Sequence, residues 1–307
     1  MNEYVRITEV APRDGLQNES IAVPTRTKCE LIRRLEATGV DEVEVTSFVS
    51  PKWVPQLADA AELVAMLADA KPESVVYSVL VPNEKGLERV LAVNDDTRVI
   101  DKVSVFTAAS ESFARKNINA SVDESIDRFR PVVDLARQAG LLVRGYISCA
   151  FVCPFEGPIE PGAVTRVAAR LLALGVDEID IADTIGGATP ETVERLVSCM
   201  HDRLGPCRET DIGEPCLTLH LHDTRGTAVE CVRKALELGV RSFDSSAAGL
   251  GGCPFASTGG GRAPGNIATD VLVRTIMDAG FKTGVDLSRL KEATGVAQAL
   301  LAGESIS

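Results

Sequence analysis

The chain repeats one local pattern, in which a glycine and an aliphatic residue separate a helical stretch from a strand-like one. The glycine is Gly39, Gly140, Gly175 or Gly239. Glycine is the residue that most readily adopts the left-handed conformation just past the end of a helix. The four glycines are 101, 35 and 64 residues apart, close to three, one and two units of about 33 residues, the length of a strand–helix unit. This spacing predicts a chain built from successive strand–helix units.

Eight such units account for most of the sequence. The predicted strands lie near residues 4–11, 41–48, 74–81, 99–106, 142–150, 177–183, 216–222 and 241–247. The predicted helices lie near residues 25–38, 56–70, 84–93, 122–139, 161–174, 190–204, 226–238 and 267–280. Strands and helices that alternate eight times are typical of an α/β protein of the (β/α)8, or TIM, barrel class. The alternative, a doubly wound open sheet, is disfavoured because no GxGxxG pattern follows the first strand.

The sequence also bears on domain organisation. No Pro-rich, Gly/Ser-rich or single-sign charged segment divides it. We therefore expect a single catalytic domain over residues 1–307, with the barrel over about 4–280 and a short helical tail over about 284–307.

Charge and composition exclude several classes of partner. Asp and Glu number 44 against 32 Lys and Arg, a formal net charge of −12, so neither nucleic acid nor an anionic membrane attracts the chain. No apolar run is long enough for a transmembrane helix, and the first residues do not resemble a signal or transit peptide, so a cytoplasmic location is expected. The eight cysteines form no CxxC pair and are expected to be reduced.

Polar residues gather at the ends of the predicted strands, where barrels of this class carry their functional groups. His220 and His222 are two residues apart near the end of the seventh strand, so their side chains point to the same face. Two neutral imidazoles placed in this way are a natural pair of metal ligands. Asp14, at the end of the first strand, is the best candidate for a third ligand. The alternative is that the two histidines belong to an ordinary loop.

Arg13 and Glu44 form a second candidate group. An Arg13 guanidinium next to a metal would stabilise an oxyanion or enolate as it develops, although a surface salt bridge is the commoner role of an arginine. Glu44 lies in an otherwise β-branched strand. A buried carboxylate there needs a partner, for which Arg13 is plausible, and a purely structural ion pair is the alternative.

Three further residues have two interpretations each. Asp183 either acts as an acid or base or caps the turn into the next helix, whereas Asp180 lies on the opposite face of the strand and is not a candidate. Cys253 lies in a Gly-rich turn, where a nearby cation would lower its thiol pKa and make it a proton donor or acceptor; otherwise it is an inert thiol. Asn266 either caps the last barrel helix or reaches the metal with its amide oxygen.

Several long motifs, taken together, resemble those of the 3-hydroxy-3-methylglutaryl-CoA (HMG-CoA) lyases, within a wider group of metal-dependent barrel lyases and Claisen-type synthases. The resemblance extends in order over about residues 5–280. The motifs are VAPRDGLQNE (10–19), TSFVSPKWVPQ (46–56), VRGYISC (143–149), DTIG (183–186), HLHDT (220–224), GLGGCPFA (249–256) and GNIAT (265–269).

The resemblance implies a set of roles. It implies a divalent cation, Mg²⁺ or Mn²⁺, held by Asp14, His220, His222 and Asn266. It implies retro-Claisen cleavage of HMG-CoA to acetyl-CoA and acetoacetate, in a homo-oligomer, either a dimer or a tetramer. The remaining implied roles are neutralisation of the enolate by Arg13, acid/base chemistry by Cys253, support by Glu44 and Asp183, and substrate contacts by Gln17, Ser47, Arg144 and Arg262.

One departure from the family pattern leaves alternatives open. The segment 254–265, between Cys253 and Asn266, is about four residues longer than the family pattern and is rich in glycine. We expect it to alter the acyl pocket, so a related 3-hydroxyacyl-CoA such as citramalyl-CoA is an alternative substrate. A Claisen-type transferase that condenses acetyl-CoA with a 2-oxo acid is a second alternative, and a metal-binding barrel without catalysis is a third.

Overall fold

The computed structural model describes residues 3–17, 19, 22–205, 216–251 and 265–302, and the side chains among these up to residue 300. Eight parallel strands close into a barrel in the order β1-β10-β9-β8-β5-β4-β3-β2, with β1 paired to both β10 and β2. The strands are β1 (Arg6–Glu9), β2 (Glu42–Ser47), β3 (Val76–Leu80), β4 (Lys102–Ala108), β5 (Leu142–Ser148), β8 (Glu178–Asp183), β9 (Leu217–Leu221) and β10 (Ser242–Ser245).

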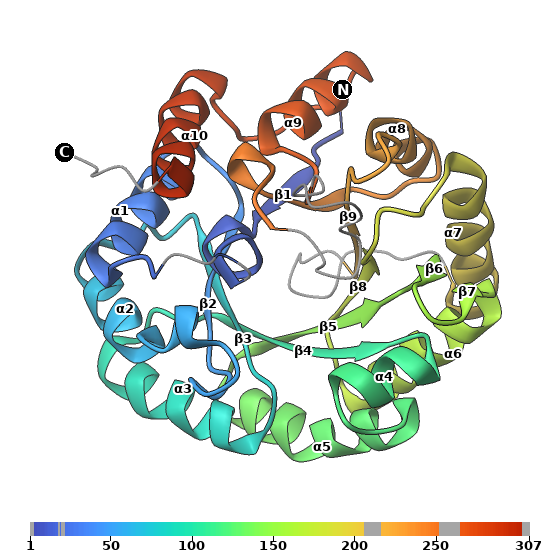
Figure 1. Ribbon diagram of the computed structural model, residues 1–307, viewed down its shortest axis with the longest axis horizontal. Coiled ribbons are helices and arrows are strands. Elements are labelled where there is room, and N and C mark those ends of the chain that lie inside the picture. Colours follow the sequence, from blue (N-terminus) through green and yellow to red (C-terminus); the bar gives the residue numbers. More distant parts are fainter. Residues whose placement is uncertain (1–2, 18, 20–21, 206–215, 252–264, 303–307) are drawn as a thin grey trace.

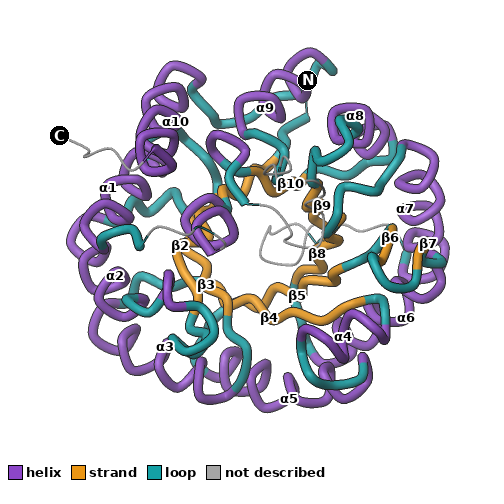
Figure 2. The backbone as a smooth tube through the Cα atoms, viewed as in Figure 1, coloured by secondary structure: helices purple, strands orange, loops and turns teal. Residues whose placement is uncertain are grey.

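Helices surround the ring of strands (Figures 1 and 2). They are α1 (Thr25–Glu36), α2 (Ala60–Leu67), α3 (Glu84–Thr97), α5 (Val122–Gln138), α6 (Pro161–Leu174), α7 (Pro190–Leu204), α8 (Ala228–Glu237) and α9 (Thr269–Asp278), followed by α10 (Leu287–Ala302), which packs against α1 and α9. The predicted (β/α)8 barrel with a C-terminal helical extension is confirmed. None of the helices that the structure describes is both long and apolar enough to cross a membrane.

The repeated glycines do what the sequence pattern predicts. Gly39, Gly140, Gly175 and Gly239 have φ of +86°, +76°, +97° and +90°, the left-handed region that residues with a β-carbon avoid. Each glycine ends a helix and turns the chain toward the next strand. The period of the repeat is therefore the period of the barrel.

Three local elements are not predicted by that repeat. A π-helical turn, Ala11–Gly15, follows β1; a short helix, α4 (Glu111–Asn117), precedes α5; and the two-stranded hairpin β6 (Val152–Cys153) and β7 (Gly157–Pro158) follows β5. All three come directly after barrel strands, so they add structure to the end of the barrel where functional groups are expected.

The inside of the barrel is unusually polar. The Lys102 ammonium bonds to the carboxylates of Glu42 (2.6 Å) and Glu178 (2.9 Å). The Arg144 guanidinium lies 2.8 Å from Glu178 and 3.2 Å from Asp244. All five of these residues are buried, and each cation is paired with carboxylates, as burial of charge requires. This layer forms the floor beneath the polar residues at the strand ends.

The cysteines differ in part from expectation. Cys29, Cys153, Cys199 and Cys231 are free thiols. Cys216 is bonded in a disulfide, so the expectation of reduced cysteines is wrong for this residue.

Glu9 carries a buried carboxylate at the end of β1. It accepts hydrogen bonds from the backbone N–H groups of Ala11 and Ala247 (both 2.9 Å) and from the Thr269 hydroxyl (2.7 Å). Burial raises its pKa from 4.5 to about 7. Glu9 therefore joins β1 to the start of α9 through a group that titrates near neutral pH.

Stability should consequently depend on pH through Glu9. The folded protein holds this proton up to about pH 7, whereas the unfolded chain releases it near pH 4.5, so the free energy of unfolding falls as pH rises through that window. Glu9→Gln cannot ionise and should lose this contribution, at most about 1.4 kcal/mol per pH unit. Urea unfolding at several pH values would measure both slopes, and equal slopes in parent and variant would contradict the assignment.

Candidate functional site

The predicted metal ligands converge at the carboxyl ends of the strands. His220 lies in β9 and His222 just after it, and their Nε2 atoms are 3.2 Å apart. Asp14 comes from the π-helical turn after β1. One ligand atom from each of Asp14, His220 and His222 lies within 4.8 Å of the others. The structure therefore brings Asp14 next to two histidines that are more than 200 residues away from it in the sequence.

Asn266 completes this group, but not as a helix cap. It lies in a bridge opposite His222, and α9 begins later, at Thr269, with Ala268 at the N-cap, so the capping interpretation is wrong. The Asn266 amide nitrogen donates to Asp14 Oδ2 and to the Leu250 carbonyl, both at 2.8 Å. These two acceptors fix the amide orientation, which leaves the amide oxygen as the free atom.

The donor atoms of this group fit a divalent cation. Asn266 Oδ1 is buried and accepts no hydrogen bond from the residues that the structure describes. Only one of the two facing nitrogens, His220 Nε2 or His222 Nε2, can carry the hydrogen of the bond between them, so the other presents a lone pair. Two imidazole nitrogens, a carboxylate oxygen and an amide oxygen form a mixed N/O ligand set. A cation at their centre would satisfy lone pairs that the protein otherwise leaves facing one another.

The protonation states suit ligation as well. Burial acts to raise the pKa of Asp14, but the Arg13 guanidinium and the two imidazoles outweigh it and hold the pKa at about 2. Burial lowers the pKa of His222 to about 4, so this imidazole is neutral at physiological pH. Carboxylate and neutral imidazole are the forms that bind metal.

Arg13 lies beside this cluster and is held on three sides. Its Nε donates to Glu44 Oε2 at 2.5 Å, its Nη1 donates to Asp14 Oδ1 at 2.8 Å, and its guanidinium carbon is 5.3 Å from the centre of the Tyr146 ring. Arg13 is thus the partner that the buried Glu44 carboxylate in β2 requires, as the sequence predicts. The guanidinium is fixed in place beside the four grouped side chains.

Asp183 ends β8 with its carboxylate turned to the backbone. Its two oxygens accept from the N–H groups of Gly187 (2.8 Å) and Ala188 (2.9 Å). Burial raises its pKa to about 6. These contacts support the turn-capping interpretation, in which Asp183 shapes the loop that leads to α7.

The predicted substrate contacts occupy different positions. Gln17 is half-buried in the helical turn after Asp14, and Ser47 is buried at the end of β2, where its hydroxyl accepts from the Val49 N–H at 3.2 Å. Arg144 lies within the barrel interior among carboxylates rather than at its rim. Cys253 and Arg262 lie outside the described residues.

Several buried residues next to these groups were missed from the sequence. The Tyr146 hydroxyl is 3.2 Å from Glu44 Oε2 and 3.3 Å from Asp244 Oδ2. Asp244 Oδ2 is 3.0 Å from His220 Nδ1, and Asp180 faces Arg144 at 3.7 Å. Polar residues at alternate positions, such as Arg144 and Tyr146 or Ser242 and Asp244, are the signal for a polar barrel interior that could have identified them.

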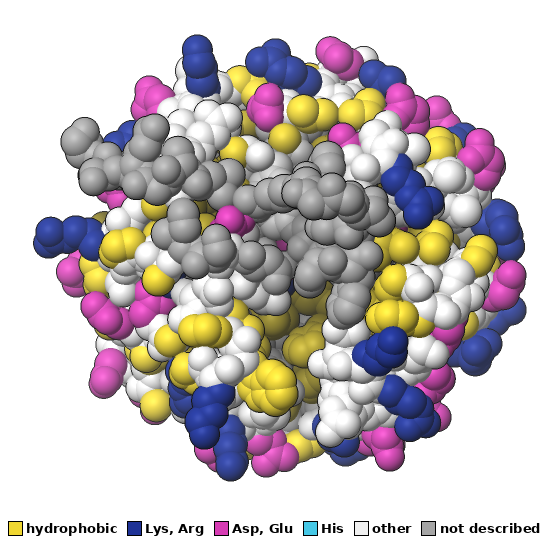
Figure 3. Space-filling view, in the orientation of Figure 1, with side chains coloured by type: hydrophobic (Ala, Val, Ile, Leu, Met, Phe, Trp, Pro, Cys, Tyr) yellow, Lys and Arg dark blue, Asp and Glu magenta, His cyan; other side chains and the backbone are white. Residues whose placement is uncertain are grey.

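On the face that carries the strand ends, charged and hydrophobic side chains occupy different areas. Lysine, arginine and acidic side chains lie mainly at the periphery of this face, and hydrophobic side chains lie nearer the centre (Figure 3).

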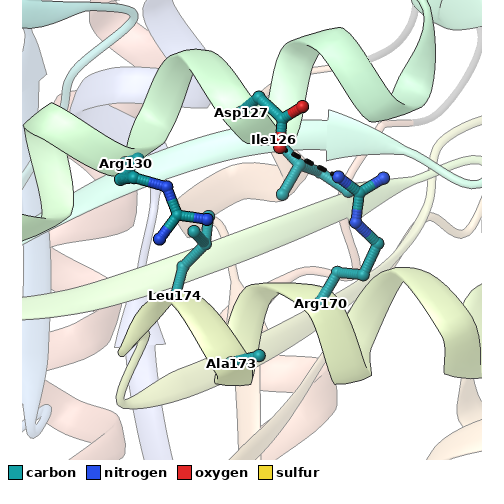
Figure 4. Close-up of a pocket in the computed structure, with 6 residues that line it drawn as sticks. All are labelled: Ile126, Asp127, Arg130, Arg170, Ala173 and Leu174. Atoms are coloured by element: carbon teal, nitrogen blue, oxygen red, sulfur yellow. Dashed lines mark hydrogen bonds and ion pairs between the residues drawn. The ribbon is translucent and has the colours of Figure 1, made fainter.

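A separate small pocket lies on the outer wall, between α5 and α6 (Figure 4). Arg170 of α6 lines it and pairs there with Asp127 of α5 at 3.0 Å. This outer pocket is remote from the strand ends and holds none of the predicted site residues.

Comparison with known proteins gives a consistent result. The HMGL-like family model matches residues 4–296. Rat cytoplasmic 3-hydroxy-3-methylglutaryl-CoA lyase and bovine mitochondrial hydroxymethylglutaryl-CoA lyase are 44% and 45% identical to the chain over 291 residues, which are 95% of this chain and 79% and 84% of those proteins.

Solved structures agree with this. The HMG-CoA lyase of Brucella melitensis is 45% identical, covers 98% of this chain and 99% of its own, and superposes with a TM-score of 0.89. The HMG-CoA lyase of Acinetobacter baumannii, solved with coenzyme A and 3-methylmalate, is 35% identical, covers 99% and 93% of the two chains, and has a TM-score of 0.87. The chain belongs to the HMGL-like family of carbon–carbon lyases.

Proposed function

We propose that this chain cleaves HMG-CoA to acetyl-CoA and acetoacetate in a metal-dependent retro-Claisen reaction. The observation that carries the proposal is the cluster of Asp14, His220, His222 and Asn266 with Arg13 fixed beside it. Relatives 44% and 45% identical bear the name of this activity. The A. baumannii relative was solved with coenzyme A, which supports an acyl-CoA as the substrate class.

The cluster of four is proposed to hold one Mg²⁺ or Mn²⁺. Carboxylate and amide oxygens favour these ions, and imidazole is compatible with Mn²⁺. When bound, the cation supplies Lewis-acid polarisation of substrate oxygens. Asp14 and His222 contribute the charge and the lone pair that their lowered pKa values keep available.

Arg13 is proposed to stabilise the enolate of acetyl-CoA. In the cleavage, the C3 hydroxyl gives its proton to a base, and its oxygen forms the C=O bond of acetoacetate as the bond between C2 and C3 breaks. The electron pair of the broken bond becomes the enolate of acetyl-CoA, which then takes a proton at C2. A guanidinium that Glu44 holds in place needs little reorganisation as this negative charge forms. Glu44 is thus a positioning residue for Arg13.

Other roles rest on sequence position or on local contacts. Cys253 is proposed to exchange the proton with the reacting atoms as a general acid/base. Gln17, Ser47 and Arg262 are proposed to contact the substrate. Arg144, predicted to contact the substrate, and Asp183, predicted to support the site, would act from the barrel floor and from the end of β8.

Gly251 offers a test of how tightly the ligand cluster is built. A β-carbon at Gly251 would lie 2.6 Å from Asn266 Nδ2 and 2.9 Å from Asp14 Oδ2, and φ there is +91°. Gly251→Ala should push these two ligands apart and lower Mn²⁺ affinity by about 10- to 100-fold. Gly226→Ala is a control for positive φ alone, because nothing lies within 4 Å of its β-carbon. Calorimetric titration with Mn²⁺ measures both, and equal affinities in the two variants would contradict the expectation.

A substrate panel tests the activity itself. The protein, supplied with Mg²⁺ or Mn²⁺, is incubated separately with HMG-CoA and with citramalyl-CoA, and the products are identified by mass spectrometry. Acetoacetate and acetyl-CoA from HMG-CoA are expected. Turnover of citramalyl-CoA alone would instead assign the altered acyl pocket, and release of CoA only from acetyl-CoA plus a 2-oxo acid would assign the transferase.

We also propose a cellular location and an oligomeric state. A cytoplasmic enzyme is proposed because the rat relative is named as cytoplasmic, while the bovine relative is named as mitochondrial. A dimer or tetramer is proposed from the resemblance, and light scattering after gel filtration measures the mass in solution.

A further inference from the structure

Asp244, from β10, contacts a predicted metal ligand on the side away from the cluster. Its Oδ2 is 3.0 Å from His220 Nδ1, and its Oδ1 accepts from Arg144 Nη1 at 3.2 Å. The Tyr146 hydroxyl lies 3.3 Å from the same Oδ2, and the Tyr146 ring meets His220 edge-on. Asp244 is 1% exposed, so water does not compete for these contacts. The carboxylate is therefore held between one fixed cation and one imidazole.

This arrangement determines which nitrogen of His220 carries hydrogen. Arginine only donates, so Asp244 Oδ1 acts as an acceptor toward Arg144. An ionised carboxylate accepts at its other oxygen too, so His220 Nδ1 must be the donor. The Nε2 lone pair of a neutral His220 is then free and points toward His222 and the ligand cluster.

The neighbouring histidine is consistent with the same assignment. With the Nε2 of His220 free, the hydrogen between the two rings belongs to His222 Nε2. His222 Nδ1 is then an acceptor, and it has no hydrogen-bond partner among the residues that the structure describes. A buried acceptor without a partner is less costly than a buried donor without one.

A second cation does not explain the Asp244 contacts. Asp180, His220 and Asp244 also have ligand atoms within 4.8 Å of one another. Arg144 already faces both carboxylates, at 3.2 Å from Asp244 and 3.7 Å from Asp180. A metal ion there would be placed against a fixed positive charge.

We infer that Asp244 is a positioning residue that sets the tautomer and ring orientation of His220, so that Nε2 is presented to the metal. The inference rests on the metal site proposed above. Histidines that bind metal commonly donate their second N–H to a carboxylate, and loss of that partner weakens metal binding about 10- to 100-fold. The polar floor of the barrel thus prepares the ligand cluster at its mouth.

Asp244→Asn distinguishes this role from a merely structural one. The asparagine oxygen must face Arg144, because two donors cannot face each other. Its NH2 group then faces His220 Nδ1, which must accept, and the ring hydrogen moves to Nε2. An isosteric Asp-to-Asn change beside a histidine is known to impose the wrong tautomer in this way. Metal can then bind at Nε2 only if the hydrogen returns to Nδ1, where the asparagine NH2 group opposes it, whereas His222 Nδ1 has no hydrogen-bond partner among the described residues that would oppose such a move.

The parent protein tests the inference first, without any variant or metal. Long-range ¹H–¹⁵N spectra of metal-free protein labelled at histidine, at about pH 9 where imidazoles are neutral, distinguish the two tautomers. There are three histidines, and His201→Gln and His222→Gln spectra assign the signals. We expect hydrogen on Nδ1 of His220. Hydrogen on Nε2 of His220 in the parent would overturn the inference.

The variant and a matched control then test the consequence. Asp244→Asn should move the His220 hydrogen to Nε2 and lower Mn²⁺ affinity by about 10- to 100-fold in titrations followed by electron paramagnetic resonance. Asp180→Asn removes an equally buried carboxyl group near Arg144 that makes no hydrogen bond to His220 within the described structure, and should keep the parental tautomer and affinity. An unchanged tautomer with parental Mn²⁺ affinity in folded Asp244→Asn would overturn the inference. If the parent itself binds no Mn²⁺, the proposed metal site fails, and the parental tautomer still decides the role of Asp244.

Discussion

Replacing His222 by alanine is expected to remove tight metal binding and to lower kcat by about a thousandfold or more, because a cation contributes several kcal/mol of charge stabilisation. His222 provides one of two imidazole nitrogens that lie 3.2 Å apart, and burial keeps it neutral and able to bind metal. Metal content by mass spectrometry after dialysis against Mn²⁺, together with kcat at saturating Mn²⁺, measures both effects.

The third histidine supplies the control for this experiment. His201 lies near the end of α7, on the outer layer of the barrel. His201→Ala should keep the metal content and the kcat of the parent. His222→Ala protein that retains one tightly bound Mn²⁺ per chain would contradict the ligand assignment, even if its activity were low.

Replacing Arg13 by glutamine is the second change with a large expected effect. Loss of one fixed donor to a developing oxyanion costs about 10²- to 10³-fold in kcat. Arg13 also pairs with Asp14, so some loss of metal affinity should accompany the change, and kcat is therefore measured at saturating Mn²⁺. Under these conditions we expect kcat to fall and KM to change much less, because the stabilised charge is absent from the bound substrate and develops only as the carbon–carbon bond breaks.

Two further variants make the Arg13 result specific. Arg13→Lys keeps a positive charge but loses the planar geometry that meets Glu44 and Asp14 together, so it should recover only part of the activity. Arg170→Gln removes an arginine from the outer pocket between α5 and α6 and should retain parental kcat (Figure 4). An Arg13→Gln enzyme with parental kcat would exclude enolate stabilisation by this residue.

The barrel could be predicted because its signals are local. Each glycine at the end of a helix has a conformation that glycine alone adopts readily, so the period was visible in one sequence. The same holds for His220 and His222, whose common direction follows from their spacing along one strand. The pairing of Arg13 with Glu44 followed from the need of a buried carboxylate for a partner.

The contacts between residues of different strands could not be predicted, because they depend on the register between strands that are distant in the sequence. Asp244 meets His220 because β10 pairs with β9 in a register that sets these two residues side by side. Arg144 meets Asp244 across the barrel, 100 positions away in the chain, and no local pattern carries that information. Asn266 was also ambiguous, since asparagine serves equally well as a helix cap or as an amide ligand. Only the folded barrel, which places the Asn266 amide next to Asp14, decides between a helix cap and an amide ligand.

The most direct test of the account joins metal occupancy to carbon–carbon cleavage in one titration. Protein stripped of metal is titrated with Mn²⁺ in the presence of HMG-CoA, bound Mn²⁺ is followed by electron paramagnetic resonance, and acetoacetate is measured at each point. The account predicts that acetoacetate formation rises in proportion to occupancy of one site per chain and stops when that site is filled. Full acetoacetate formation by the stripped protein, or a filled site that yields no acetoacetate, would contradict it.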